Sequence, residues 1–92
     1  MAFLHIIAVG SPLKSSERVK NKIITLIDKG RRLDPADLES FNRWAQNSYE
    51  ALEFNPSQQQ RFEKYCRMSC DSLKMRLFIG VWILSLSLDA LM

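Results

Sequence analysis

The sequence contains few of the residues that catalysis and metal binding require. It has one histidine, His5, and two cysteines among 92 residues. Zinc needs about four ligands, and His5 lies in an apolar segment far along the chain from both cysteines. There is also no glycine-rich phosphate loop and no Gly-x-Ser-x-Gly nucleophile motif. The sequence therefore argues against an enzyme, and it predicts no catalytic residue, no metal ligand and no cofactor.

The two cysteines, Cys66 and Cys70, fit a structural role better than a disulfide. They fall in a helical pattern, four positions apart, so their side chains share one face of a helix. Helix geometry meets the distance and angle requirements of a disulfide poorly. We expect both cysteines to be buried small hydrophobic residues, which is typical of a reducing compartment.

The chain also lacks an apolar run long enough to cross a bilayer. Residues 77–92 are apolar apart from Asp89 and a few serines, but they fall short of the ~20 residues that a membrane-spanning helix needs. Residues 1–10 are apolar as well, without the positive leader or clear cleavage site of a signal peptide. We therefore expect a cytoplasmic protein without a membrane partner.

What the sequence does contain is enough apolar material for a core. Hydrophobic residues make up 47% of the chain, with five Phe, two Tyr and two Trp, which argues against disorder. No repeat, low-complexity tract or long linker divides the chain. We expect one compact domain over residues 1–92.

Helix-capping residues predict three helices, near residues 15–31, 34–54 and 57–75. Ser15 or Ser16 is a candidate N-cap for the first helix. Asp34 precedes a proline, which suits an N-cap followed by the first helical position, and Asn55 repeats the same pattern. Gly30 is a plausible residue just past the end of the first helix.

The two ends of the chain leave alternatives open. Residues 1–10 have the composition of a short strand or extended segment, and the alternative is a first helical turn or two. The apolar stripe of the third helix continues through residues 77–92 at helical spacing, but Phe78, Val81 and Trp82 favour a strand by residue type. We favour a helix, broken or kinked near Gly80. The predicted fold is mainly α, a small three- to four-helix bundle, and the alternative adds a short N-terminal strand paired to a C-terminal segment.

Each predicted helix has an apolar face that we expect to be buried, with Trp44 and Trp82 as core aromatics or, alternatively, as anchors of a protein interface. The faces comprise Val19, Ile23, Leu26 and Ile27 in the first helix; Leu38, Phe41, Ala45, Tyr49 and Leu52 in the second; and Phe62, Cys66, Cys70, Leu73 and Leu77 in the third.

Charge is distributed in blocks, although the net charge is only +3. The blocks are basic, acidic and basic in chain order. In the first block, Arg18, Lys22, Lys29 and Arg32 follow at steps of four, seven and three, so they share one helix face with Thr25. Such a row fits a phosphate backbone, an acidic protein groove or plain water.

A second basic group surrounds Tyr65 in the third predicted helix. An arginine beside an aromatic ring can hold phosphates and stack on exposed bases, and the alternative is that Tyr65 is buried and the cations are solvated. The candidate binding residues on the two basic faces are Arg18, Lys22, Lys29, Arg31, Arg32, Arg61, Lys64 and Arg67.

Taken over its whole length, from Met1-Ala-Phe-Leu-His-Ile-Ile-Ala-Val-Gly10 to Ser85-Leu-Ser-Leu-Asp-Ala-Leu-Met92, the chain resembles the small phage-encoded anti-CRISPR proteins. It looks most like the group that blocks the type I-F Csy surveillance complex. These inhibitors share small size and compactness rather than a motif, so the resemblance assigns a role to no residue here.

The resemblance implies a stoichiometric inhibitor in the cytoplasm of a host bacterium. Its partners would be Cas proteins of the surveillance complex, with contact to the guide RNA, and it would prevent target DNA from binding or pairing. Many such inhibitors are acidic DNA mimics, whereas this chain is basic and more naturally contacts guide RNA or acidic protein surface. The alternative is a small basic helical module for nucleic-acid binding or oligomerisation, without a CRISPR target.

Overall fold

The computed structural model describes the backbone of residues 2–91 and the side chains of residues 17–91. Every element within residues 2–91 is helical, which confirms the prediction of a mainly α bundle and excludes a strand there. The elements are α1 (Ala2–Arg32), α2 (Leu38–Ala51), the 3₁₀ turn η1 (Leu52–Phe54), α3 (Pro56–Phe62), the π-helical turn η2 (Glu63–Arg67) and α4 (Leu73–Asp89).

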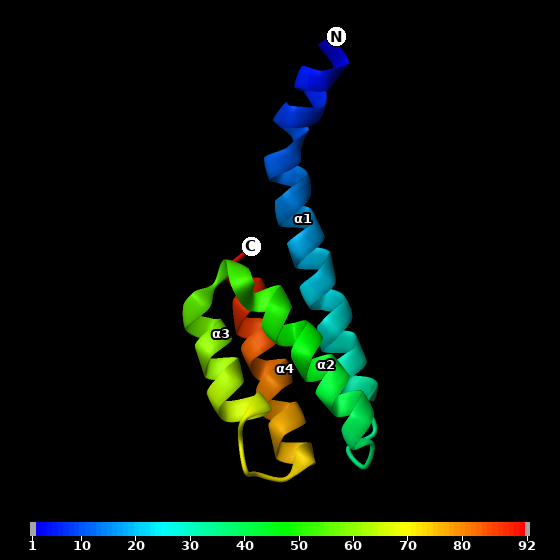
Figure 1. Ribbon diagram of the computed structural model, residues 1–92, viewed down its shortest axis with the longest axis vertical. Coiled ribbons are helices and arrows are strands. Elements are labelled where there is room, and N and C mark those ends of the chain that lie inside the picture. Colours follow the sequence, from blue (N-terminus) through cyan, green and yellow to red (C-terminus); the bar gives the residue numbers. More distant parts are fainter. Residues whose placement is uncertain (1, 92) are drawn as a thin grey trace.

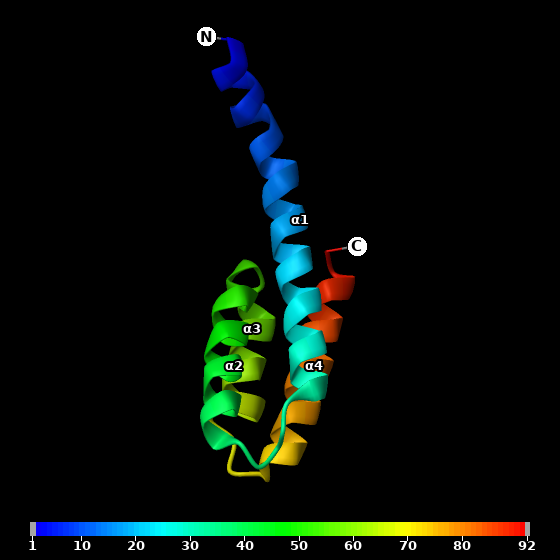
Figure 2. The same ribbon diagram turned by 90° about the vertical axis from the view of Figure 1, so that its right-hand side faces the viewer.

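The most extensive helix packing is between α1 and α4, and α2 packs against both of them while α3 packs mainly against α4 (Figures 1 and 2). The C-terminal half of α1 runs antiparallel to α4, and α2 crosses beside them. The N-terminal half of α1 extends past the end of the bundle, which gives the molecule extents of 54 × 23 × 18 Å.

Trp44 of α2 occupies the centre of the core, between α1 and α4. Its indole Nε1 donates a hydrogen bond to the carbonyl oxygen of Leu26, at 2.8 Å. A Cβ added at Gly30 would lie 2.6 Å from Trp44 Cζ2, and one added at Gly80 would lie 2.8 Å from Trp44 Cη2. Since real Cβ atoms do not approach so closely, α1 and α4 fit around the indole only because each presents a glycine.

The rest of the core follows the predicted apolar faces in most places. The buried apolar side chains come from every helix: Ile23, Leu26, Ile27, Phe41, Ala45, Leu52, Phe62, Cys66, Leu77, Ile83 and Leu84. Leu38, Cys70 and Trp82 were expected in the core, but all three are exposed. Leu38 is the first residue of α2 and Cys70 lies in a loop, so neither is carried by a packed helix face.

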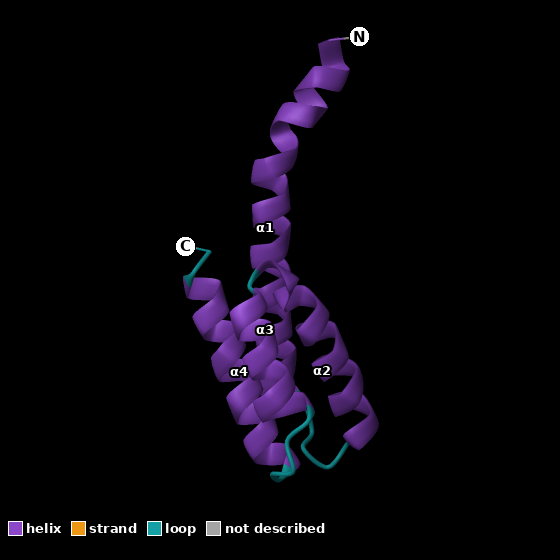
Figure 3. Cartoon of the chain, turned by 60° about the vertical axis from the view of Figure 1, so that its left-hand side comes forward, coloured by secondary structure: helices purple, strands orange, loops and turns teal. Residues whose placement is uncertain are grey.

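For residues 2–10 the strand alternative is wrong and the helical alternative is confirmed, because these residues form the first turns of α1. A strand would need a partner, and the only candidate segment, residues 77–92, is helical through Asp89. Ser15 and Ser16 therefore lie inside α1 instead of capping it, and Gly30 is also internal. Figure 3 shows the N-terminal half of α1 bending, and that half contains Pro12, a residue type without the backbone N–H that a helix interior needs.

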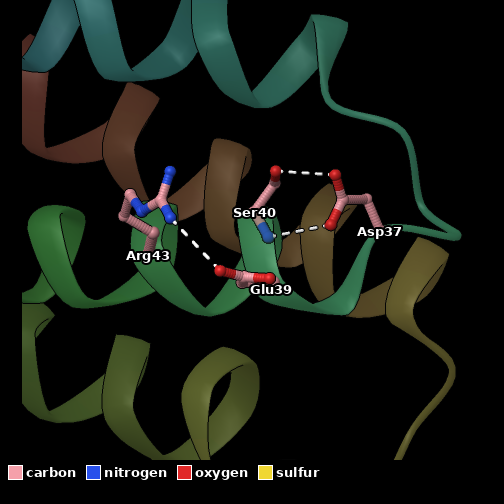
Figure 4. Close-up of polar contacts among 4 residues, drawn as sticks. All are labelled: Asp37, Glu39, Ser40 and Arg43. Carbon is pink, nitrogen blue, oxygen red and sulfur yellow. Dashed lines mark hydrogen bonds and ion pairs between the residues drawn. The ribbon is translucent and has the colours of Figure 1, made fainter.

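Asp37, and not Asp34, caps α2 (Figure 4). The carboxylate of Asp37 accepts hydrogen bonds from the Ser40 backbone N–H at 3.0 Å and from the Ser40 hydroxyl at 2.7 Å. Asp34 instead accepts from the backbone N–H of Ala36 at 2.9 Å, forming a local turn that delays the helix by three residues. The expected Asn55 cap is confirmed, since its Oδ1 accepts from the backbone N–H of Gln58 at 3.4 Å.

The third predicted helix is broken, since α3 continues into the π-helical turn η2 only as far as Arg67 and α4 begins at Leu73. Ser72 caps α4, and its Oγ accepts from the backbone N–H of Met75 at 3.3 Å. The guanidinium of Arg76 closes the break by donating to the carbonyl oxygens of Cys66 and Arg67, both at 2.7 Å. The helical alternative for residues 77–92 is confirmed through Asp89, without a break at Gly80.

Candidate interaction surfaces

The described residues offer little for catalysis or metal binding. No group of three His, Cys, Asp or Glu side chains within them is arranged to hold a metal ion. Burial raises the pKa of the Cys66 thiol to about 12, so its thiolate is scarce at neutral pH and it is a poor nucleophile. None of the described helices combines the length and apolarity needed to span a membrane.

The first surface is a basic stripe, which we define as Arg18, Lys22, Lys29 and Arg32. All four side chains are exposed and lie on one side of α1, at the spacing expected from the sequence. The opposite side of the helix is anchored in the core by Ile23 and Ile27. The packing thus fixes the rotation of α1 so that the basic stripe faces outward.

The basic stripe borders two shallow grooves beside α2. One, of about 480 Å³, is lined by Thr25, Lys29, Arg32 and Arg43, and the other, of about 300 Å³, by Lys22, Lys29 and Asn47. Lysine and arginine side chains here lie next to the neutral hydrogen-bonding groups of Thr25 and Asn47, and the carboxylate of Asp28 also lines the larger groove. A phosphate or carboxylate entering either groove would meet both kinds of partner.

Ion pairing leaves most of the stripe uncompensated among the described side chains. Arg32 pairs with Asp28, with 3.3 Å between Nε and Oδ1, and both side chains are largely exposed. Arg43 of α2 pairs with Glu39 at 3.5 Å (Figure 4). Exposed pairs of this kind are worth little and open easily. Arg18, Lys22 and Lys29 have no ion pair within the described residues. Lys22 also lines a further groove together with Glu50 and Glu53.

Arg31 does not belong to the basic stripe. It is exposed, but it lines a different groove of about 500 Å³ between α1 and α4, together with Lys74, Phe78 and Trp82. On a helix, a residue next in sequence points about 100° away, which carries Arg31 round to the α4 side. The structure therefore separates it from the other cations of the first block.

The second predicted basic face is smaller than expected. Arg61 and Lys64 are exposed, with Lys64 Nζ 5.4 Å from the ring centre of the exposed Tyr65. Arg67 is half-buried: it pairs with Glu63 at 3.3 Å, and its guanidinium lies 4.8 Å from the ring centre of Tyr49. Because Arg67 is held by these two contacts, only two cations of this group are freely presented.

The structure also shows an apolar ridge on α4, of which the sequence predicted only Trp82, as the alternative anchor of a protein interface. We define the α4 ridge as Met75, Phe78 and Trp82, whose side chains are 49%, 71% and 56% exposed. The signal was present in the sequence, because these residues lie off the buried seam formed by Leu77 and Leu84. A helix with apolar residues on both sides indicates two covered faces.

Comparison with known protein families, with curated proteins and with solved structures found no match in any of the three. A function is therefore inferred from the basic stripe and the α4 ridge.

Proposed function

We propose that this chain is a binding protein, not an enzyme, that acts as a stoichiometric inhibitor of an RNA-guided surveillance complex. The resemblance to anti-CRISPR proteins points to the type I-F Csy complex in the cytoplasm of a host bacterium. The inhibitor docks through the basic stripe and blocks binding of target DNA or its pairing with the guide RNA. The observation that carries this proposal is the outward-facing stripe beside the α1–α2 grooves, of whose four cations only Arg32 is ion-paired among the described side chains.

The length of the stripe suits a polyanionic partner. Arg18 and Arg32 are fourteen residues apart in one helix, which corresponds to about 21 Å at 1.5 Å per residue. A DNA duplex carries about twelve phosphates over that length. Guide RNA held in a surveillance complex, or an acidic protein groove, would present negative charge on a comparable scale.

A second candidate function is binding of free nucleic acid without a CRISPR target. The observation that favours it is the pair of Lys64 and Tyr65, an exposed cation beside an exposed ring, on a second face of the molecule. Such a pair suits stacking on an unpaired base. Salt separates the two candidates, because binding to a lone polyanion weakens steeply with added salt, whereas docking on a shaped protein surface weakens less.

The test compares two double variants that each lose two exposed cations. Lys22→Gln with Lys29→Gln removes the centre of the basic stripe, and Arg61→Gln with Lys64→Gln is the matched control. The measurement is a mobility shift of a Csy-type complex on its DNA target, with each protein added in series. We expect the wild type and the control to suppress the shift, and the stripe variant to need about tenfold more protein, equivalent to ~1.4 kcal/mol.

Two results would count against the proposal in different ways. Equal inhibition by the stripe variant and the wild type would show that the stripe is only a solvated face. Failure of the wild type to suppress the shift would reject the CRISPR target, and a parallel titration with single-stranded RNA would then test the second candidate. Circular dichroism of each variant checks that the helical fold is retained.

A further inference from the structure

Helix α4 is apolar on both of its sides, although only one side packs within the bundle. Leu77, Ile83 and Leu84 are buried against the other helices. On the opposite side, Phe78 and Trp82 are mostly exposed, and no described side chain covers them. Contiguous exposed apolar patches of several hundred Å² often mark interaction sites. The outer face of α4 is therefore a candidate interface.

The exposed side of α4 has the spacing of a helix–helix seam. Met75, Ile79, Trp82 and Leu86 follow at steps of four, three and four, the pattern by which one helix packs along another. Ile79 and Leu86 are half-buried at the edge of this seam. A straight helix is therefore the natural shape of the partner.

Grooves on both sides of the ridge can receive the side chains of that partner. The groove between α1 and α4 has a volume of about 500 Å³. A second groove, of about 360 Å³, lies between α4 and the α3–η2 segment and is lined by Tyr65, Ile79 and Leu86. Trp82 lines both grooves, so it stands at the middle of the apolar surface.

We propose that the α4 ridge is a self-association surface, on which α4 of a second copy packs antiparallel with its centre at Trp82. The charges at the two ends of α4 favour this occupant. Lys74 lies at the N-terminal end and Asp89 at the C-terminal end, each about two turns from Trp82. An antiparallel pair brings each Lys74 close to Asp89 of the second copy, and it sets Phe78 against Leu86.

The available area is consistent with a reversible dimer. Aromatic side chains bury about 150–250 Å² each when fully covered, and the ridge residues are roughly half exposed. The ridge then supplies about 300–400 Å² per copy, with the groove walls adding to it, against a typical ~800 Å² per partner in a stable complex. The area is below that of a stable complex, so the dimer is expected to be weak and reversible.

The dimer does not rest on the proposed function, because the two surfaces are separate. The basic stripe lies on the α2 side of α1, whereas the α4 ridge lies on the other side of the α1–α4 pair. Both stripes stay exposed in the dimer. If the proposed function holds, the dimer presents two basic stripes to one nucleoprotein, and linked binding raises its apparent affinity.

Sedimentation equilibrium of the full chain, at roughly 1–200 µM, tests the dimer. We expect a concentration-dependent rise from the monomer mass of 10.7 kDa towards twice that value. Phe78→Ser with Trp82→Ser should raise the dissociation constant at least tenfold and leave the circular dichroism spectrum unchanged, since both side chains are exposed. The control is Leu38→Ser, at a similarly exposed leucine on α2, which should leave the dissociation constant of the dimer unchanged.

A charge swap tests the antiparallel arrangement. Lys74→Glu alone should weaken the dimer severalfold, because it places like charges at both ends of the seam, and adding Asp89→Lys should restore it. A wild type that sediments as a monomer at every concentration overturns the proposal and leaves the ridge to a different partner. Dimerisation that the ridge variant does not weaken, or a swap that fails to restore association, also overturns it.

Discussion

At the scale of single residues, one tryptophan and two glycines determine how the bundle fits together. Trp44 is 4% exposed and reaches both long helices, with Gly30 and Gly80 on either side of its ring. A glycine inside a helix costs about 1 kcal/mol relative to alanine. Glycine is nevertheless present at both position 30 and position 80, because a Cβ at either of them would collide with the indole of Trp44.

Gly80→Ala should therefore destabilise the protein, although alanine is the better helix former. The new Cβ would lie 2.8 Å from both Cys66 Sγ and Trp44 Cη2, and overpacking of this kind costs about 1–3 kcal/mol. Chemical denaturation followed by circular dichroism measures the change. An unchanged or higher midpoint would show that the core has room at this position and that the close approach is not required.

The Asp37 cap makes stability depend on pH. Hydrogen bonds from the Ser40 backbone and hydroxyl lower the pKa of the Asp37 carboxyl from its ordinary value of 3.8. A carboxyl with a lowered pKa in the folded state stabilises the fold above the ordinary value, and this contribution is lost as the pH falls through the lowered value. The cap therefore stabilises α2 at neutral pH and loses this contribution in strong acid.

Asp37→Ala should accordingly lower the thermal midpoint at pH 7, and the gap from wild type should narrow below pH 3.8. Asp37→Asn is the matched control, since asparagine also caps helices but does not titrate there. Thermal melts across this pH range give the comparison. A gap between wild type and Asp37→Ala that stays constant with pH would contradict the assignment of the cap.

At the scale of elements, the sequence predicted the helices better than their ends. The predicted cap at Asn55 is correct, because the residues that follow it form a helix at once. The predicted cap at Asp34 is wrong, because Asp34 forms a turn and Asp37 caps the helix. The break between α3 and α4 was missed because the apolar spacing runs through it without interruption. The exposed Cys70 shows that equal spacing does not ensure a continuous helix.

The same limit applies to the basic residues. Periodicity was sufficient to place Lys22 and Lys29 on one exposed face, because both belong to one long helix. It was insufficient for Arg67, whose surroundings depend on Tyr49 of another helix. Contacts between elements, which no local pattern encodes, decide which cations are freely presented.

Arg76 joins the segments on either side of the break between η2 and α4. Its replacement therefore tests how much this connection contributes to stability. Besides its two bonds to carbonyl oxygens, its guanidinium lies 4.7 Å from the ring centre of Phe41. A lysine cannot hold both carbonyls in the same fork geometry. Arg76→Lys should therefore cost about 1–3 kcal/mol, as expected when partly buried acceptors lose their donor.

The control is Arg61→Lys, at an exposed arginine in α3, which should change stability by less than about 0.5 kcal/mol. Urea denaturation of both variants provides the measurement. Equal midpoints for the two variants would mean that Arg76 does not hold the break closed.

At the scale of the whole molecule, the bundle separates two surfaces of different chemistry. The basic stripe runs along α1 beside α2, and the apolar ridge runs along α4. Packing of α1 between α2 and α4 keeps the two apart, because the core residues of α1 fix its rotation. The proposed binding of a polyanionic partner and the proposed self-association can therefore be tested with separate variants.

The central claim is that the basic stripe neutralises negative charge on its partner, and salt dependence tests it most directly. The affinity of the wild type and of Lys22→Gln with Lys29→Gln for the Csy-type complex is measured between about 50 and 200 mM salt, a range over which phosphate contacts change affinity strongly. If both lysines contact phosphates, the slope of log affinity against log salt should become shallower by about 1.4–1.8 in the variant. Equal slopes for the two proteins would contradict the claim.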